Sequence, residues 1–184
     1  MKPFEKTSEL VAFIESAKRF TPKVNLDKME FLCALFGHPE KTFPSIHVSG
    51  TNGKGSVVAS LKAVFRAAGL KVGSFTSPYI TRFNERIMIN DAMIGDEDLL
   101  RIGNKIIAKY EEMESQGKEL PTFFEFTTLL AFLYFSEIPD LDFAIIEVGI
   151  GVKLDSTNVI EPLLSVISNR SEERRVGKEG RSRW

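Results

Sequence analysis

The chain has 184 residues, of which 43% are hydrophobic, and its formal net charge is -1 at pH 7. A chain of this length can bury one good core and is short for two full domains. No apolar run reaches the roughly 18 residues that cross a bilayer, and the N-terminal MKPFEKTSEL lacks the layout of a signal peptide. We therefore expect a cytoplasmic protein without a membrane partner. The single cysteine, Cys33, lies in the apolar run FLCALF and is interpreted as a core residue.

The apolar patterns predict helices and strands that alternate along the chain. In chain order they are helices at 8–20 and 26–36, a strand at 46–48, a helix at 56–68, a strand at 71–75, an extended segment at 86–90, helices at 96–115 and 124–135, and strands at 142–149 and 162–169. Because the last two strands are continuously apolar, both of their faces are expected to be buried. The fold class that follows is α/β, with a parallel sheet and helices on both faces.

The last fifteen residues, 170–184, read RSEERRVGKEGRSRW and have no apolar period. A basic arm for nucleic acid is one interpretation of their charge. The segment closely resembles the conceptual translation of a sequencing-adapter oligonucleotide, so we interpret it as an artefact and expect no nucleic-acid partner. Without it, 18 basic and 22 acidic residues remain, a net charge of -4. Fold reasoning is therefore confined to residues 1–169.

The stretch SGTNGKGS at 49–56 lies between a β-branched strand and a helical pattern. A strand that passes through such a loop into a helix points several backbone N–H groups into one concavity at the positive end of the helix dipole, where phosphate binds. Lys54 can reach the terminal phosphates, and Ser56 can meet a phosphate oxygen or Mg²⁺. The P-loop match is imperfect because Gly55 separates these two residues. A glycine-rich turn with a solvated lysine is the alternative.

Four motifs follow one another in the chain: HVSGTNGKGSV at 47–57, SFTSPYITRFNERI at 74–87, TFFEF at 122–126 and EVGIGVKLDSTNVI at 147–160. Together they resemble the folylpolyglutamate synthase and dihydrofolate synthase family, which belongs to the Mur ligase superfamily. The resemblance runs from about residue 26 to residue 169, and four motifs in order make it specific. It implies a fold of the Mur ligase central-domain type, with residues 1–169 as the N-terminal part of its ATP-binding domain.

This resemblance implies an ATP-dependent amide ligase with ATP and Mg²⁺ as cofactors. ATP would phosphorylate a carboxylate of dihydropteroate or of a folate's terminal glutamate, and the amine of L-glutamate would attack the acyl phosphate. Such an enzyme acts mainly by positioning its substrates and neutralising phosphate charge. The implied partners are these small molecules, and a monomer is expected.

Carried onto this sequence, the resemblance places the ATP phosphates on Gly50, Thr51, Asn52, Gly53, Lys54, Gly55 and Ser56. It implies Mg²⁺ ligation by Ser77 and Glu147, with Ser56 beside them, and catalytic roles for Lys54 and Glu147. This set of ligands suits Mg²⁺, which prefers oxygen atoms and is usually bound by few protein carboxylates. Independently of the family, a carboxylate that ends a parallel strand near a glycine loop lies in the crevice where such sheets bind ligands.

The resemblance also implies two segments that hold the pterin-bearing substrate: Thr122, Phe123, Phe124 and Glu125, and Leu154, Asp155 and Ser156. Taken alone, these phenylalanines would more often be core residues and Asp155 a turn residue. Arg82 and Arg86 are candidates for contact with an anionic folate, with solvated loop arginines as the alternative. His47 is interpreted as a core histidine and His38 as a loop residue.

Two features depart from the family pattern. Val152 and Lys153 stand where the family has glycine and arginine, and the segments that follow SVISN in the family, including an Asp-His pair and a C-terminal domain, are absent. We therefore expect an N-terminal fragment that is inactive alone and aggregates through an unpaired sheet edge. A stand-alone P-loop kinase or NTPase and a non-catalytic nucleotide-binding module remain as alternatives, and the sequence does not separate the two ligase activities.

Overall fold

The computed structural model describes residues 2–17, 26–149 and 155–169. Its centre is a six-stranded sheet with the strand order β4-β3-β2-β5-β1-β6. Strands β2, β5, β1 and β6 are parallel, whereas β3 pairs antiparallel with β2 and β4 antiparallel with β3. The strands are β1 (Ser45–Ser49), β2 (Val72–Phe75), β3 (Ile87–Ile89), β4 (Ala92–Met93), β5 (Phe143–Glu147) and β6 (Leu164–Ile167). The sheet is thus mainly parallel, with an antiparallel hairpin at one edge.

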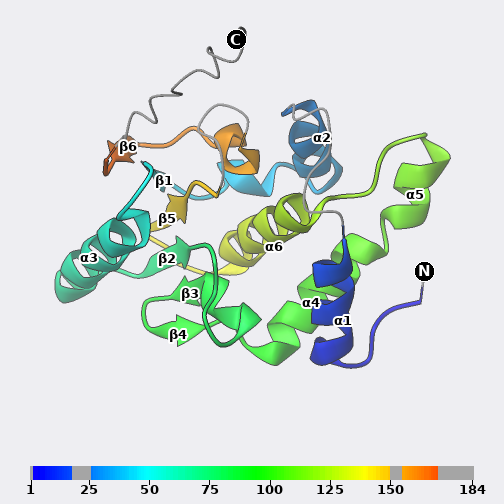
Figure 1. Ribbon diagram of the computed structural model, residues 1–184, viewed down its shortest axis with the longest axis horizontal. Helices are drawn as coiled ribbons and strands as arrows, with labels where there is room; N and C mark the ends of the chain where they lie inside the picture. Colours follow the sequence, from blue (N-terminus) through cyan, green and yellow to red (C-terminus); the bar gives the residue numbers. More distant parts are fainter. Residues whose placement is uncertain (1, 18–25, 150–154, 170–184) are drawn as a thin grey trace, which may run out of the picture.

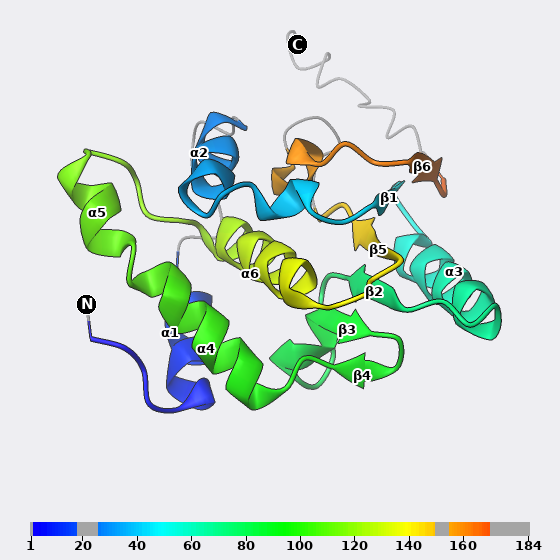
Figure 2. The same ribbon diagram turned by 180° about the vertical axis from the view of Figure 1, so that it is seen from behind.

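The α-helices of the described residues are α1 (Thr7–Ser16), α2 (Asp27–Leu35), α3 (Lys54–Ala67), α4 (Asp96–Ile107), α5 (Tyr110–Ser115) and α6 (Phe123–Glu137). Short 3-10 helices are η1 (Pro39–Lys41), η2 (Phe83–Arg86) and η3 (Ser156–Val159). The two faces of the sheet carry very different amounts of helix: α3 lies on one face, and α1, α2, α4 and α6 gather on the other (Figures 1 and 2). The larger hydrophobic core lies on the α6 face, and a small one of Ile46, Val48, Val58, Val72 and Ile145 lies under α3.

Helix α6 is apolar all round because it is surrounded by protein. Every residue from Glu125 to Phe135 is buried, and the helix contacts α1, α2 and α4. A helix with an apolar surface on all sides belongs in the interior of a domain. Its 15 residues are too few for a bilayer span, and none of the other helices in the described ranges is long and apolar enough for one.

The predicted helices and strands are present, with several differences in detail. For the helix predicted at 8–20, α1 ends at Ser16, and residues 18–20 lie outside the described residues. The helix predicted at 96–115 is divided into α4 and α5 at Ala108 and Lys109, where neither glycine nor proline stands, and β4 was not predicted. Helix α3 begins at Lys54, two residues earlier than expected, because Gly53 adopts a left-handed conformation and caps it. The prediction that residues 162–169 form a buried strand is wrong. Strand β6 lies at the sheet edge, and Leu164 and Ile167 are exposed.

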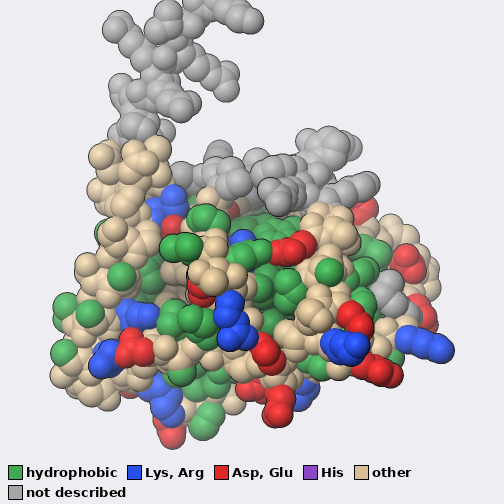
Figure 3. Space-filling view, turned by 60° about the horizontal axis from the view of Figure 1, so that its bottom comes forward, with side chains coloured by type: hydrophobic (Ala, Val, Ile, Leu, Met, Phe, Trp, Pro, Cys, Tyr) green, Lys and Arg blue, Asp and Glu red, His purple; other side chains and the backbone are tan. Residues whose placement is uncertain are grey.

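The surface carries charges of both signs in close alternation. Figure 3 shows Lys and Arg side chains interspersed with Asp and Glu over one face of the molecule. Several of these charges form ion pairs, such as Arg101 with Asp98 and with Glu137. Exposed pairs of this kind contribute little to stability, so the fold depends mainly on the core beneath α6.

Candidate nucleotide- and substrate-binding site

The predicted phosphate loop connects β1, an interior strand beside the edge strand β6, to α3. Gly50 has φ +141° and Gly53 has φ +80°, both in the region that favours glycine. A Cβ atom on Gly50 would also lie only 2.2 Å from the Ser168 hydroxyl oxygen. Because α3 begins at Lys54, the residues Lys54, Gly55 and Ser56 form its first turn, whose N–H groups lack partners within the helix. The loop therefore has the geometry of an anion-binding helix N-terminus.

The end of β6 braces this loop from its other side. The Ser168 hydroxyl donates to the carbonyl oxygen of Asn52 at 2.6 Å and to that of Ser49 at 3.3 Å. The Thr51 N–H donates to the Asn169 carbonyl oxygen at 2.6 Å. These contacts join residues more than 100 positions apart, and the sequence carried no signal for them. The shape of the phosphate loop therefore depends on the end of β6 as well as on the glycines of the loop itself.

Lys54 and Glu147 lie near each other at the carboxyl ends of neighbouring strands. The Lys54 Nζ donates to the Gly50 carbonyl oxygen at 3.0 Å, so the amine is folded over the loop. Glu147 ends β5 and is only 4% exposed. Burial raises the pKa of the Glu147 carboxyl, while the Ser77 N–H and the charge of Lys54 act in the opposite direction. The structure therefore brings these predicted catalytic residues together.

Ser77 approaches the same carboxylate from the loop that follows β2. Its N–H donates to Glu147 Oε2 at 3.2 Å. Ser56 is exposed on the first turn of α3. A buried carboxylate with a hydroxyl-bearing residue beside it fits a hard divalent cation whose other ligands are water and phosphate. No group of three His, Cys, Asp or Glu side chains with the spacing of a metal site occurs in the described part of the chain. Any cation here would therefore depend on a bound nucleotide for further ligands.

The predicted substrate segment at 122–125 forms the N-terminus of α6. The Thr122 hydroxyl accepts from the Glu125 N–H at 3.3 Å, and the Glu125 carboxylate accepts from the Thr122 N–H at 2.7 Å, which is a capping box. Lys28 of α2 forms an ion pair with Glu125 at 2.9 Å, a contact the sequence did not indicate. Thr122 and Glu125 thus fix the helix end.

The two phenylalanines of this segment are half-buried, unlike residues 125–135 of α6, which are all buried. The Phe124 ring lies where a Cβ on Gly149 would be, at 2.2 Å, so it packs closely against the chain just beyond β5. It also contacts Phe75 of β2, with ring centroids 6.0 Å apart. The start of α6 therefore lies at the same sheet edge as Glu147.

The second predicted substrate segment is described only in part, since Leu154 lies outside the described residues, as do Val152, Lys153 and 170–184. Asp155 is buried and caps η3: its Oδ1 accepts from the Thr157 N–H at 3.0 Å and from the Thr157 hydroxyl at 2.6 Å. The same hydroxyl lies 2.8 Å from Nε2 of His47 on β1, and burial lowers the pKa of His47. His47 is thus a hydrogen-bonded interior histidine, as expected. Ser156 is half-buried at the start of η3.

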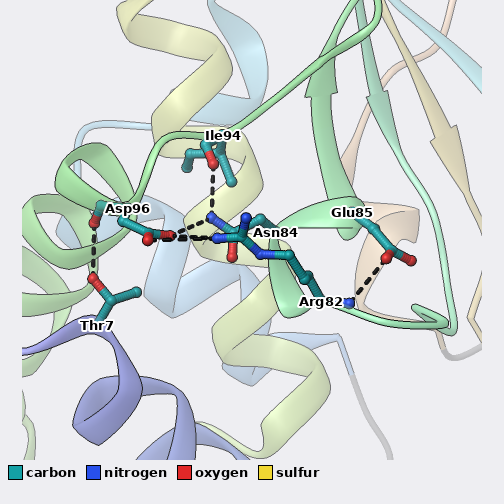
Figure 4. Close-up of polar contacts among 6 residues, drawn as sticks. All are labelled: Thr7, Arg82, Asn84, Glu85, Ile94 and Asp96. Carbon is teal, nitrogen blue, oxygen red and sulfur yellow. Dashed lines mark hydrogen bonds and ion pairs between the residues drawn. The ribbon is translucent and has the colours of Figure 1, made fainter.

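The loop between Ser77 and η2 is held by Glu85. Its carboxylate accepts from the N–H groups of Ile80 at 2.8 Å, Thr81 at 3.0 Å and Arg82 at 2.9 Å, which lowers the pKa of Glu85. Figure 4 shows this carboxylate turned back toward the Arg82 main chain, and Asn84 and the Arg82 side chain both directed at Asp96. A hollow of about 290 Å³ is lined by Arg82, Asn84, Met93, Ile94, Gly95 and Asp96. Arg82, which was considered for contact with folate, is exposed here and pairs with Asp96, in agreement with the alternative of a solvated loop arginine.

The glycine loop joins an interior parallel strand to a helix N-terminus, and a buried acid ends the neighbouring strand. This arrangement defines an α/β protein of the P-loop type. A scan against models of protein families finds no match. The chain is 46% identical over 158 residues to the dihydrofolate synthase/folylpolyglutamate synthase of Bacillus subtilis (strain 168). The matched region covers 86% of this chain and 37% of that protein.

Solved structures give the same assignment. A structure described as an FPGS-AMPPCP-folate complex matches with a TM-score of 0.83 and 42% identity, over 88% of this chain and 40% of that one. A bifunctional folylpolyglutamate synthase/dihydrofolate synthase with Mn, AMPPNP and L-glutamate bound matches with a TM-score of 0.74 and 27% identity, over 89% of this chain and 38% of that one. The chain belongs to the folylpolyglutamate synthase/dihydrofolate synthase family and spans about two fifths of the length of these relatives.

Proposed function

We propose that residues 1–169 supply the N-terminal part of the ATP-binding domain of an ATP-dependent amide ligase. The ligase joins L-glutamate to dihydropteroate or to a folate through an acyl phosphate. The observation that carries this proposal is the meeting of the glycine loop, Lys54 and Glu147 at the carboxyl ends of β1 and β5. Support comes from relatives whose solved structures hold nucleotide analogues, folate or L-glutamate.

In this proposal the loop residues 50–56 bind the phosphates through their N–H groups, as helix N-termini do. Lys54 leaves the Gly50 carbonyl and neutralises the phosphoryl group in transfer. Glu147 and Ser77 hold Mg²⁺, together with Ser56. When bound, the cation neutralises phosphate charge. Burial of Glu147 keeps its charge close to that of Lys54 in a partly dry environment, where each charge acts more strongly than in water.

The acid substrate lies between the α6 N-terminus and η3 in this proposal. Phe123 and Phe124 offer half-buried rings for a pterin, and Thr122 and Glu125 fix the helix end that carries them. Asp155 and Ser156, with Leu154, contact the same substrate from the opposite segment. Positioning of carboxylate, phosphate and amine is the main task of such a site. We further propose a cytoplasmic monomer that acts on small molecules, without nucleic-acid or membrane partners.

The test uses a full-length protein, termed here the joined ligase, in which residues 1–169 precede the part of the B. subtilis relative that lies beyond its matched segment. Glutamate-dependent ADP release is measured with dihydropteroate and with a reduced folate as alternative acids. We expect release that requires ATP, Mg²⁺, glutamate and one of the two acids. ATP hydrolysis that is indifferent to acid and glutamate would instead favour a stand-alone NTPase.

A further inference from the structure

Arg86 is a buried cation at the end of η2. It is only 5% exposed, and its Nε and Nη1 atoms are buried without a hydrogen-bond partner. Burial lowers the pKa of its guanidinium. A charged group taken out of water is costly unless its donors are paired, and unpaired buried donors are rare in folded proteins. Arg86 therefore needs an explanation that the fold alone does not supply.

Aromatic rings enclose the guanidinium on several sides. Its Cζ lies 5.0 Å from the ring centroid of Tyr79, 5.0 Å from that of Phe123 and 5.9 Å from that of Phe83. The Tyr79 hydroxyl donates in turn to Glu15, an exposed residue of α1. Ring faces attract a cation, yet they offer no lone pair to N–H groups that point outward in the guanidinium plane. The cage thus stabilises the charge without satisfying the donors at Nε and Nη1.

The cage lies between the two halves of the proposed site. The Arg86 carbonyl oxygen accepts from the Thr76 N–H at 2.9 Å, and the next residue, Ser77, donates its N–H to Glu147. On the other side, Phe123 begins α6 and belongs to the proposed substrate segment. The Arg86 backbone therefore adjoins the segment of the proposed Mg²⁺ ligand Ser77, and its guanidinium adjoins Phe123 of the proposed pterin platform.

We propose that Arg86 binds a carboxylate of the acid substrate through donors that are unpaired in the unliganded chain. The proposal rests on the proposed function and names the group of the substrate that is recognised. A planar guanidinium holds its N–H donors at fixed angles and can direct them at a carboxylate with a geometric specificity that a lysine ammonium lacks. Tyr79 belongs to the loop between β2 and η2, and this wall of the cage moves to admit the carboxylate.

Arg82 provides a matched control four residues away, at the other end of the same 3-10 turn. Its side chain is 59% exposed and forms an ion pair with Asp96 at 3.3 Å, as Figure 4 shows. An exposed pair of this kind has little effect on stability. The two arginines therefore differ in burial and pairing while sharing charge, length and local sequence.

The first test is the thermal stability of the unliganded joined ligase with Arg86→Met, which keeps an unbranched apolar stem and removes the charge. Replacing a buried unpaired charge by an apolar group is expected to raise the midpoint of unfolding, by about 2–4 °C. Arg82→Met should leave it unchanged. A lower midpoint for Arg86→Met would show that the cage is a structural support and would overturn the proposal.

The second test measures binding of folate and of 6-methylpterin, which lacks a carboxylate, to the same chains. We expect Arg86→Met to weaken folate binding roughly ten- to a hundredfold and to leave 6-methylpterin unaffected, since charge-assisted hydrogen bonds are lost only with folate. Arg86→Lys should recover part of the affinity, and Arg82→Met should match the unsubstituted chain. Unchanged folate binding in Arg86→Met would overturn the proposal, as would an unsubstituted chain that binds nucleotide and not folate. Failure of the proposed function would appear separately, as absence of nucleotide binding, and the melting comparison does not depend on it.

Discussion

The glycine-loop side and the α6 side of the sheet are built in opposite ways. On the glycine-loop side, α3 covers a small core, residues 51–53 are exposed, and the loop is held by a few hydrogen bonds, several of them from Ser168 and Asn169. On the other side, α6 is buried from Glu125 to Phe135 and begins in a capping box. The loop residues expected to bind phosphate can therefore be replaced without unfolding the chain. The substrate platform, Phe123 and Phe124 at the start of α6, instead packs against the core.

The largest expected effect is the loss of ligation on replacing Lys54. Lys54→Ala in the joined ligase should lower turnover roughly 100- to 1,000-fold, because it removes the cation placed against the transferred phosphate. Its unfolding transition should be unchanged, since the side chain contributes one bond to a loop carbonyl. Lys62→Ala, two turns further along α3, is the control and should retain activity. Near-normal turnover of Lys54→Ala would contradict the assignment of Lys54 and of the glycine loop to phosphate transfer.

A large effect on stability is expected on the opposite side of the sheet. Leu130 of α6 is fully buried, so Leu130→Ala should cost about 2–5 kcal/mol of unfolding free energy. Leu61→Ala on α3, where the side chain is only partly buried, should cost clearly less. Urea denaturation of the two variants of the joined ligase gives both values. Equal costs at the two positions would remove the contrast between the faces.

A smaller effect is expected at the helix cap that carries the substrate platform. Thr122→Ala removes the oxygen that accepts from the Glu125 N–H and should cost about 1 kcal/mol. Thr122→Ser keeps the oxygen and should restore most of that stability. The same denaturation measurement applies. If serine and alanine gave the same loss, the missing methyl group rather than the capping bond would be responsible.

The smallest expected effect is a pH dependence with opposite signs at two glutamates. Because burial raises the pKa of Glu147 above 4.5, the folded chain binds its proton more tightly than the unfolded chain, and stability falls as pH rises above about 4.5. Glu147→Gln should therefore gain stability relative to the parent as pH increases.

Glu85 should behave in the opposite way. Its pKa is lowered by the N–H groups of Ile80, Arg82 and Thr81, so the stability it contributes is present above 4.5 and is lost as pH falls through the lowered value. Glu85→Gln should therefore lose stability at neutral pH and approach the parent in acid. Parallel pH profiles for the two variants would contradict these assignments.

Local sequence patterns predict much of the fold but less of the candidate site. Continuous apolar runs identified β5 and α6, and glycines marked the loop before α3, because these signals depend on near neighbours in the chain. The exposure of β6 was missed because an apolar strand reads the same at a sheet centre and at an edge. The bracing by Ser168, the Lys28–Glu125 pair and the cage around Arg86 join distant segments, so only the folded chain brings them together.

The central claim is that the carboxyl edge of β1 and β5 binds the phosphates of a nucleotide. Its most direct test is the change in backbone amide NMR shifts of the joined ligase on addition of AMPPNP and Mg²⁺, repeated with Lys54→Ala. Within residues 1–169, we predict shifts that concentrate on residues 50–56, Ser77 and Glu147 and that largely disappear in the variant. Shifts centred instead on the hollow beside Arg82 and Asp96, or none at high nucleotide concentration, would contradict the claim.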